Sequence, residues 1–224
     1  MWAETIIQII LLRLAVAVRV WYAALSSKTI PAFEMERAKS GAPINLNGIP
    51  RKHGHIARDL GRLTVCAAGA ATGIGLALWA LDLPSSPFFL ASLGGSTIFL
   101  FGLTRAPAAQ PRALFGGHLG GALIGVLCFQ CFGDALWVYA LSVTLTLIYM
   151  LITKTVHPPA GANPLIMVHG HANFIALWQP VGLGILILAS VAVIWSRLAP
   201  GMVHYPTKWL DKSPPFMSWG SWNE

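Results

Sequence analysis

The sequence predicts an all-α, polytopic helical membrane protein with about six membrane segments, of which two are short and interrupted. The 224-residue chain is 55% hydrophobic and only 10% charged, whereas a soluble domain carries about 25% charged residues. Between positions 63 and 196 the only charged residues are Asp82, Arg105, Arg112, Asp134 and Lys154. Proline, glycine and polar turns divide this apolar region into runs of helical length.

Residues 1–57 form the first predicted domain, an N-terminal interfacial helix and polar arm. Residues 1–25 are apolar but contain Arg13 and Arg19, and no small-residue cleavage signature follows them. We therefore expect an interfacial helix or an extra span rather than a removed signal peptide. Residues 26–57 are polar and rich in Gly, Pro and Asn, which is typical of a surface arm.

The predicted transmembrane domain covers residues 58–200. Its apolar runs are 60–81, 88–104, 113–132, 135–153, 156–168 and 174–196. A simple spanning helix needs about 20 residues, so the second run is slightly short, and the fifth is short and broken by Pro and Gly. A Trp-rich C-terminal tail, residues 201–224, suits the membrane interface.

The positive charges indicate an orientation. If all six runs cross and the residues before position 58 are cytoplasmic, every Lys and Arg of this region falls on the cytoplasmic side. These residues are Arg58, Arg62, Arg105, Arg112, Lys154, Arg197, Lys208 and Lys212. The opposite turns, "LDLPSS", "FGD" and "HGHAN", contain neither residue type. We favour six crossing segments, although a second or fifth run that turns back within the membrane is the alternative.

A weak internal similarity at an offset of 69 residues relates two halves of this domain. Residues 91–92 map onto 160–161, and residues 110–111 map onto 179–180. Each half then has a long run, a short run and another long run. Because three crossings leave the chain on the opposite side of the membrane, the second copy must be inverted relative to the first. Secondary transporters often have such inverted repeats, with short broken segments at the substrate site. Chance similarity in a biased composition is the alternative.

The stretch "HPPAGANP", residues 157–164, interrupts the fifth run. A backbone group without a partner in hydrocarbon costs several kcal/mol, so this stretch should face protein or a water-filled cavity. Gly161 permits close approach, and Asn163 can donate and accept hydrogen bonds. Exposed N–H groups at the start of a half-helix suit an anion. A plain helix entry with Pro in the first turn explains the same residues.

The second run, "LASLGGSTIFLFG", is the matching short segment of the first half. Gly94 and Gly95 would let another backbone come close, and Ser96 and Thr97 supply hydroxyl groups. The pairing with the fifth run favours a solute site, and close helix packing through small residues is the alternative.

His118 lies in the glycine-rich third run, between Gly117 and Gly121. Their GxxxG spacing predicts contact with another helix. An ionisable residue within a span is a functional candidate, here for carrying a proton or donating to an anion. A neutral histidine that is bonded to a carbonyl is the alternative. Arg112, with Arg105 and Lys154, could attract an anion to a vestibule or simply set the topology.

Two stretches resemble a known family of integral membrane proteins. "TVHPPAGANPLI" is similar to the signature of the HPP family, and "AQPRALFGGHLGGALIGVLCFQCFG" resembles its second well-marked region. The resemblance covers about residues 58–197. It implies that the motif residues matter for function, and these are His157, Pro158, Pro159, Gly161, Asn163, Pro164, Gln110, Pro111, Arg112, Gly117 and His118.

The family is usually described as four-spanning, and its chloroplast and cyanobacterial members are linked to nitrite transport. The resemblance therefore implies transport of a small anion, with nitrite as the expected substrate, through a pathway lined by the two broken segments. The expected substrate-binding residues are His157, Pro158, Gly161, Ala162, Asn163, Gly94, Gly95, Ser96, Thr97, His118 and Arg112. A channel for another small solute and a non-transporting membrane scaffold or sensor subunit are the alternatives.

Other functional classes find little support. No nucleophile–base pair or credible metal-ligand set is evident, so we expect no enzyme activity, no cofactor and no metal. No compact basic domain points to nucleic acid. The expected partners are the anion, the lipid bilayer and further copies of the chain in a homo-oligomer. We expect a bacterial inner membrane, with the chloroplast envelope as the alternative.

Overall fold

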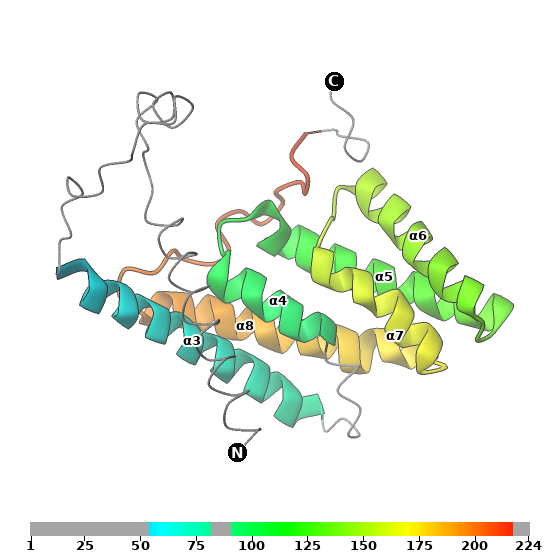
Figure 1. The fold of residues 1–224 in the computed structure, drawn as a ribbon, viewed down its shortest axis with the longest axis horizontal. Helices are drawn as coiled ribbons and strands as arrows, with labels where there is room; N and C mark the ends of the chain where they lie inside the picture. The colour runs from blue at the N-terminus through cyan, green and yellow to red at the C-terminus, as the bar shows by residue number, and fades with distance from the viewer. Residues whose placement is uncertain (1–53, 82–90, 217–224) are drawn as a thin grey trace, which may run out of the picture. The chain divides into compact units, whose positions relative to one another are not determined.

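The computed structural model describes residues 54–81 and 91–216, with side chains from residue 58 onward. These residues form helices joined by turns (Figure 1). The α-helices are α3 (Gly54–Leu81), α4 (Ala91–Gly102), α5 (Pro111–Phe132), α6 (Leu136–Thr153), α7 (Asn163–His169) and α8 (Leu183–Leu198). Shorter turns are η3 (Pro107–Ala109), η4 (Pro158–Ala162), η5 (Phe174–Leu177) and the π-helical η6 (Trp178–Gly182). The expected interfacial helix at residues 1–25 lies outside the described residues.

Four helical stretches are long and apolar enough to cross a membrane. They are Arg58–Leu81, Pro111–Phe132, Leu136–Thr153 and Phe174–Leu198. The α4 helix has 12 residues, which is about 18 Å at 1.5 Å per residue. The segment formed by η4 and α7, residues 158–169, is equally short and changes from a 3-10 turn to an α-helix at Asn163. The prediction of a polytopic helical protein with two short segments is confirmed.

The α4 helix runs antiparallel to α3. Phe101, near the end of α4, packs against Gly69 and Gly73, whereas Leu93 near its start packs against Leu81 at the end of α3. The turn after α4 then brings Arg105 level with Gly61 and Arg62. The chain from Leu93 to Arg105 therefore runs back along α3, from its end toward its start.

The broken segment around residues 158–169 runs parallel to α5. His157 lies against Gly117, Pro164 against Gly125, and Val168 against Cys128. Thr155 and His171 mark the two ends of this passage. The structure thus contains four long segments and two short ones, and successive segments alternate in direction.

One end of the bundle carries the basic residues. The starts of α3 and α5 and the ends of α6 and α8 meet there, together with residues 199–213. Arg112 donates to the carbonyl of Thr153, and the Gln110 side chain accepts from the backbone N–H groups of Thr207 and Lys208. The other end carries Asp134 and His171. This distribution matches the charge asymmetry expected for six crossings.

The packing is also the one expected of an inverted repeat. The α3 helix packs against α4 and α8, as α6 packs against α7 and α5. The α4 helix packs on α8, as α7 packs on α5, and the two short segments pack on each other. The aligned dipeptides coincide less well, because Pro111 opens α5 whereas Pro180 lies inside η6, before α8.

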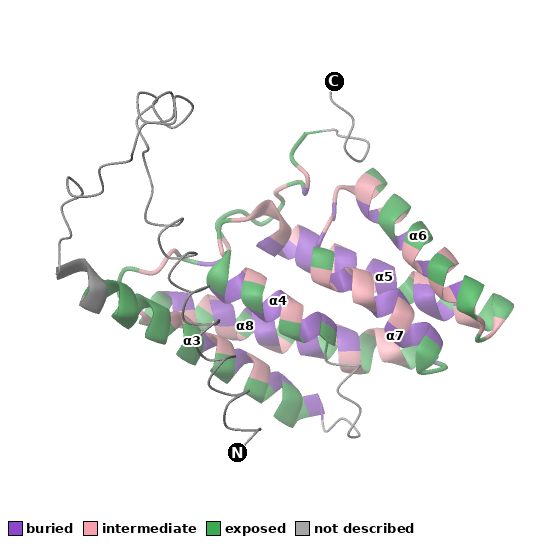
Figure 2. Cartoon of the chain, in the orientation of Figure 1, coloured by how far each residue is buried: buried purple, intermediate pink, exposed green. Residues whose placement is uncertain are grey.

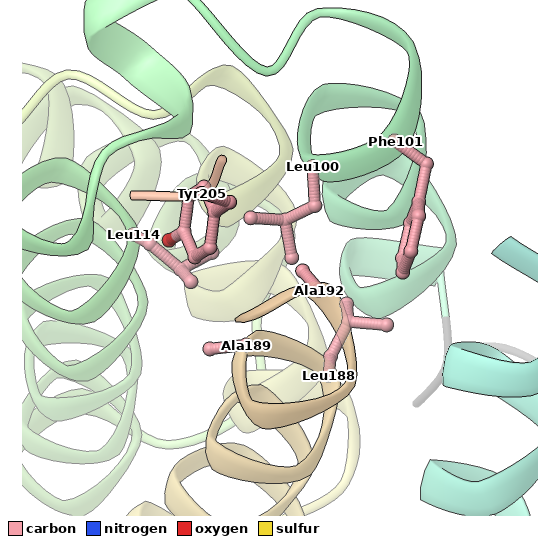
Figure 3. Packing of buried hydrophobic residues seen from close by; sticks show 7 residues of the cluster. All are labelled: Leu100, Phe101, Leu114, Leu188, Ala189, Ala192 and Tyr205. Atoms are coloured by element: carbon pink, nitrogen blue, oxygen red, sulfur yellow. The ribbon is translucent and has the colours of Figure 1, made fainter. Parts of the chain in front are cut away.

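A hydrophobic cluster joins the first short segment to α5, α8 and the tail. Figure 3 shows its side chains, which are Leu100, Phe101, Leu114, Leu188, Ala189, Ala192 and Tyr205. Tyr205 belongs to the tail that the sequence predicts at the membrane interface, but its side chain is only 1% exposed. The tail folds back over the bundle, where the Arg197 guanidinium donates to the Tyr205 carbonyl and the Ser196 hydroxyl accepts from its N–H group.

Exposed apolar residues follow the outer faces of the long helices, while α4, α5 and α7 carry most of the buried positions (Figure 2). The exposed side chains include Leu63, Trp79, Leu136, Ile152 and Ile194. In a membrane protein this surface faces lipid. Within η4, Ala160 is buried, whereas Pro158 is exposed and Pro159, Gly161 and Ala162 are partly exposed.

Candidate functional site

The chain between α6 and α7 is shaped by local backbone signals. Lys154 ends α6 in the left-handed conformation, with φ 55°. The next residues are extended, and the N–H group of Val156 donates to the carbonyl of Ser213 in the tail. Pro158 occupies the first position of η4, where its missing N–H group leaves no intrahelical bond unmade. These features direct His157 toward the interior.

A row of glycines on α5 allows this segment to approach closely. A Cβ atom at Gly117 would lie 3.0 Å from the His157 Cβ, and one at Gly121 would lie 3.0 Å from the Ala160 carbonyl oxygen. At Gly125 a Cβ would lie 2.7 Å from the Pro164 Cα. The GxxxG spacing therefore predicts a real contact, and the partner is the broken segment.

Ser96, His118, His157 and Asn163 form a buried polar network between the short segments and α5. The Ser96 hydroxyl oxygen lies 2.7 Å from His118 Nε2 and 2.8 Å from His157 Nε2. His157 Nδ1 lies 2.6 Å from the carbonyl oxygen of Ala108. Asn163 Nδ2 lies 3.0 Å from His118 Nδ1 and donates to the His118 carbonyl at 2.9 Å.

This polar network is closed to solvent in the described structure. Ser96, His118 and His157 are 0% exposed and Asn163 is 1% exposed. The two imidazole rings are tilted, with centroids 5.1 Å apart, and Phe99 packs edge-on against His157. Two positive rings at this separation would repel by about 3 kcal/mol at an effective dielectric constant of about 20. The histidine pair therefore favours at most one positive charge.

The other predicted residues of α4 lie around this network without joining it. Thr97 is buried, and its hydroxyl donates to Leu93 of its own helix. Gly95 faces the second short segment, since a Cβ there would lie 2.8 Å from the Pro159 Cβ. Gly94 faces outward and has open space beside it.

On the second short segment, Pro158 is exposed, and Gly161 and Ala162 are half-buried. A Cβ atom at Gly161 would meet nothing within 4 Å. The structure thus brings Ser96, His118, His157 and Asn163 together, while Pro158 points away from them. The role of these residues in binding a solute stays a prediction.

Arg112 is separate from the polar network. Its Nη2 atom donates to the Thr153 carbonyl at 2.8 Å, which ties the start of α5 to the end of α6. Its buried Nε atom has no hydrogen-bond partner among the described residues. The Arg112 guanidinium lies at the basic end of the bundle. It makes no hydrogen bond to His118 or His157.

Gln110 and the Ala108 carbonyl are two contributors that the predicted site omits. Gln110 is 0% exposed, and its amide donates to the carbonyls of Thr104 and Ala106 while accepting from the tail. It fixes the turn that presents the Ala108 carbonyl to His157. The "AQPR" motif contains Gln110, but no local spacing indicates which carbonyl would meet the histidine.

A cavity of about 640 Å³ opens at the basic end, away from the polar network. It lies between α3, the end of α4 and residues 200–203, and its lining includes Arg62, Arg105, Cys66 and Phe101. Its position and two arginines suit a vestibule that concentrates anions. Neither His118 nor His157 belongs to the lining of this cavity.

The opposite end carries a second polar cluster. Asp134 Oδ2 lies 2.9 Å from His171 Nε2, and the ring of Phe129 stacks on His171 at 4.8 Å. The hydrogen bond from the His171 ring, followed by one from the Tyr139 hydroxyl, lowers the pKa of the Asp134 carboxyl. This cluster joins the α5–α6 turn to the turn after α7.

Comparison with known proteins identifies the family. A model of the HPP transmembrane region matches residues 56–206. The chain belongs to the HPP transmembrane family. The match contains both short segments of this HPP protein, its complete polar network and Tyr205 of the tail, so it extends slightly beyond the region in which the sequence motifs are evident.

Two curated relatives of this HPP protein are transmembrane proteins of Dictyostelium discoideum. One is 33% identical over 130 residues, which cover 54% of this chain and 42% of the relative. The other is 31% identical over 128 residues, covering 54% of this chain and 45% of the relative. The chain thus spans less than half the length of the curated relatives it matches. No solved structure matches this HPP protein.

Proposed function

We propose that this protein transports a small anion across the membrane, with nitrite as the first candidate. The observation that carries the proposal is the buried polar network, which connects both broken segments and α5. Polar groups inside a membrane protein are costly and mark substrate or proton pathways. The chain belongs to the HPP family, whose chloroplast and cyanobacterial members are linked to nitrite transport. This membership is the reason for choosing nitrite as the first candidate substrate.

The closed site favours a transporter over an open channel. All four members of the network are buried, so a solute reaches them only after the short segments move. A planar anion could exchange its hydration for the Asn163 amide, the Ser96 hydroxyl and N–H groups near Gly161, where an added Cβ atom would meet nothing within 4 Å. The arginine-lined cavity at the basic end would gather the anion.

A flux assay with the purified chain in liposomes tests the proposal. We expect nitrite uptake above that of protein-free liposomes, and competition by nitrate or formate but not by urea. Competition by urea instead would favour a channel for neutral solutes. Absence of nitrite uptake with and without a pH gradient would contradict the proposal and leave the scaffold or sensor role.

Variants test the site separately. We expect His157→Ala and Asn163→Ala to reduce nitrite uptake at least about tenfold, since each removes a buried hydrogen-bonding group. His204→Ala and Asn173→Ala are matched controls, because both residues are exposed and lie outside the polar network. Full uptake by both site variants would contradict the site while leaving nitrite transport standing.

We also propose a bacterial inner membrane location and a homo-oligomeric state. The α5 glycines are used within the chain, against the broken segment. The exposed Gly61 and Gly75 of α3 remain available for contact between copies. The mass of the purified protein in nanodiscs, measured with and without a bulky Gly75→Leu substitution, tests this assembly.

A further inference from the structure

The hydrogen-bond partners fix where the protons of the histidine pair reside. The Ala108 carbonyl can only accept, so His157 Nδ1 carries a proton and donates to it at 2.6 Å. The Asn163 Nδ2 group can only donate, and its orientation is set by the His118 carbonyl that it also reaches. His118 Nδ1 therefore accepts, and the proton of the neutral His118 ring lies on Nε2. This proton points at Ser96.

The Ser96 hydroxyl has three close partners and one proton. It accepts from His118 Nε2–H, and it can donate either to His157 Nε2 at 2.8 Å or to the Ser92 carbonyl at 2.9 Å. With both rings neutral, only one of these two contacts is a hydrogen bond at a time. All three contacts become hydrogen bonds together when His157 Nε2 also carries a proton, because the hydroxyl then accepts twice and donates to Ser92.

We propose that Ser96 makes the histidine pair a binding site for one proton, which is held on His157 Nε2. A proton delivered by hydronium forms an N–H bond with the Nε2 lone pair and leaves a water molecule. The Ser96 O–H bond rotates from His157 to the Ser92 carbonyl and breaks no covalent bond. As part of the proposed transport, this proton would move with the anion and compensate its charge.

The geometry assigns the proton to His157 rather than to His118. The free nitrogen of His118 faces the Asn163 N–H group, so a proton there would oppose another donor. Phe99 covers His157 without supplying a competing group. The 5.1 Å ring separation then disfavours a second charge on the pair. One proton per site follows.

The other ionisable groups on the neighbouring elements lie outside the hydrogen-bonded network of Ser96 and the two histidines. Among the described residues, α4 has none, Arg112 donates to Thr153, and Arg197 donates to the carbonyls of Val193 and Tyr205. The remaining ones on the packed elements are Arg58, Asp59, Arg62 and Cys66 of α3, Cys128 and Cys131 of α5, Tyr139 and Tyr149 of α6, and His169 of α7. Tyr149 donates to the Gly116 carbonyl, and the Tyr139 hydroxyl lies 3.5 Å from His169.

Nitrogen-15 NMR of histidine-labelled protein in lipid nanodiscs tests the proton positions directly. At high pH we expect N–H signals from Nδ1 of His157 and from Nε2 of His118, assigned by comparison with His157→Asn. On acidification His157 should gain a second N–H while His118 keeps one. A proton gained first by His118, or by both rings together, would overturn the proposal.

Variants at Ser96 test its part in holding the proton. At the pH where half of His157 is charged, Ser96→Ala should reduce the charged population about tenfold, because the cation loses one hydrogen bond. Ser96→Thr retains the hydroxyl and should restore the signal. Ser142→Ala is the matched control, since this buried serine bonds only to its own helix. An unchanged charged population in Ser96→Ala would overturn the role of the hydroxyl.

A transport arm separates this inference from the proposed function on which it rests. An inward proton gradient should stimulate nitrite uptake by the wild-type chain. Ser96→Ala should lower uptake under all conditions, because its hydroxyl is proposed to bind the anion, and the uptake that remains should no longer respond to the gradient. Equal stimulation in both would overturn the coupling. If the wild-type chain shows no uptake while the NMR result holds, the proposed transport fails and the proton site stands.

Discussion

At the scale of single residues, Asn163 determines which ring nitrogen of His118 accepts a hydrogen bond and which one donates. Its amide is held by the His118 carbonyl and therefore presents a donor to the His118 ring. That choice fixes the proton of His118 toward Ser96, and the Ala108 carbonyl fixes the proton of His157 away from it. The Asn163 amide and the Ala108 carbonyl thus determine which nitrogen of each neutral histidine ring carries the proton.

Replacing Asn163 with the isosteric leucine should destabilise the protein. Asn163→Leu leaves His118 Nδ1 without its donor inside the protein, and a buried polar atom without a partner costs about 1–3 kcal/mol. Thermal unfolding in nanodiscs measures the loss. Asn173→Leu, which removes an exposed side-chain bond to the Ile175 N–H group, should cost less, and equal losses would contradict the importance of the buried contact.

The Tyr205 hydroxyl should be dispensable although its ring is not. The side chain is buried, and its oxygen has no hydrogen-bond partner among the described residues. Burial also raises the pKa of this hydroxyl, so it stays neutral. Tyr205→Phe should unfold at the same or a higher temperature, whereas Tyr205→Ala should lose about 3–5 kcal/mol of packing. A clear loss in Tyr205→Phe would reveal a bound partner, such as an ordered water.

Some of these residues can be predicted from the sequence alone and others cannot, for a physical reason. His118, His157, Asn163 and Ser96 stand out because polar residues in apolar runs need partners. Their mutual contacts depend on the relative rotation and height of three helical segments, which no local pattern records. The position of Tyr205 likewise depends on a tail that folds back over the bundle.

At the scale of elements, the glycine row of α5 sets how closely the broken segment can lie. Gly117, Gly121 and Gly125 follow each other at one-turn spacing and face residues 157–167. A side chain at any of them would press on backbone or on Pro164. The close packing at these glycines therefore sets the distance from α5 at which His157 and Asn163 lie, and so their contacts with His118.

A single added methyl group on this row should be costly. In Gly125→Ala the new Cβ would lie 2.7 Å from the Pro164 Cα and 2.8 Å from its carbonyl oxygen, so the helices must separate. We expect a loss of about 1–3 kcal/mol in thermal unfolding. Gly75→Ala is the matched control, because it meets nothing within 4 Å and improves helix propensity. Similar losses in both variants would argue against the close packing.

The cluster at the end opposite the basic residues should give a pH-dependent contribution to stability. Because the folded pKa of Asp134 is lowered by His171 and Tyr139, the contribution is present above the unfolded pKa of about 3.9. It is lost as the pH falls through the folded value. The melting temperature of Asp134→Asn should therefore lie below wild type at pH 6 and approach it near pH 3.

A double-mutant cycle with His171→Ala provides the control for this contact. In the His171→Ala background, Asp134→Asn should change the melting temperature much less at pH 6, because the main hydrogen-bond partner is already absent. An undiminished effect would place the origin of the stabilisation elsewhere.

At the scale of the whole molecule, segments of alternating direction explain why the charges gather at one end. Side-specific labelling tests the arrangement in a chain whose native cysteines are replaced by alanine. Arg105→Cys and Lys154→Cys should react with an impermeant maleimide from the same side as Lys208→Cys, and Gly170→Cys from the other side. Labelling of Arg105→Cys together with Gly170→Cys would indicate that α4 turns back.

The number and order of the segments could be predicted because each boundary has a local cause. Turns rich in Pro, Gly and charge end every apolar run, and the charge asymmetry distinguishes a crossing from a re-entrant segment. The residue-level repeat is less predictable, since Pro111 and Pro180 occupy different helical positions. The contacts between elements are therefore more symmetric between the two halves than the aligned residues are.

The tail contacts have a consequence for biosynthesis. The N–H group of Val156 is bonded by Ser213, and the Gln110 amide by Thr207 and Lys208. These partners are translated about 50 to 100 residues after the groups they bind, or several seconds later at about 5–20 residues per second. During synthesis, the segment around Val156 and the turn at Gln110 therefore remain without these hydrogen bonds until residues 207–213 have been made.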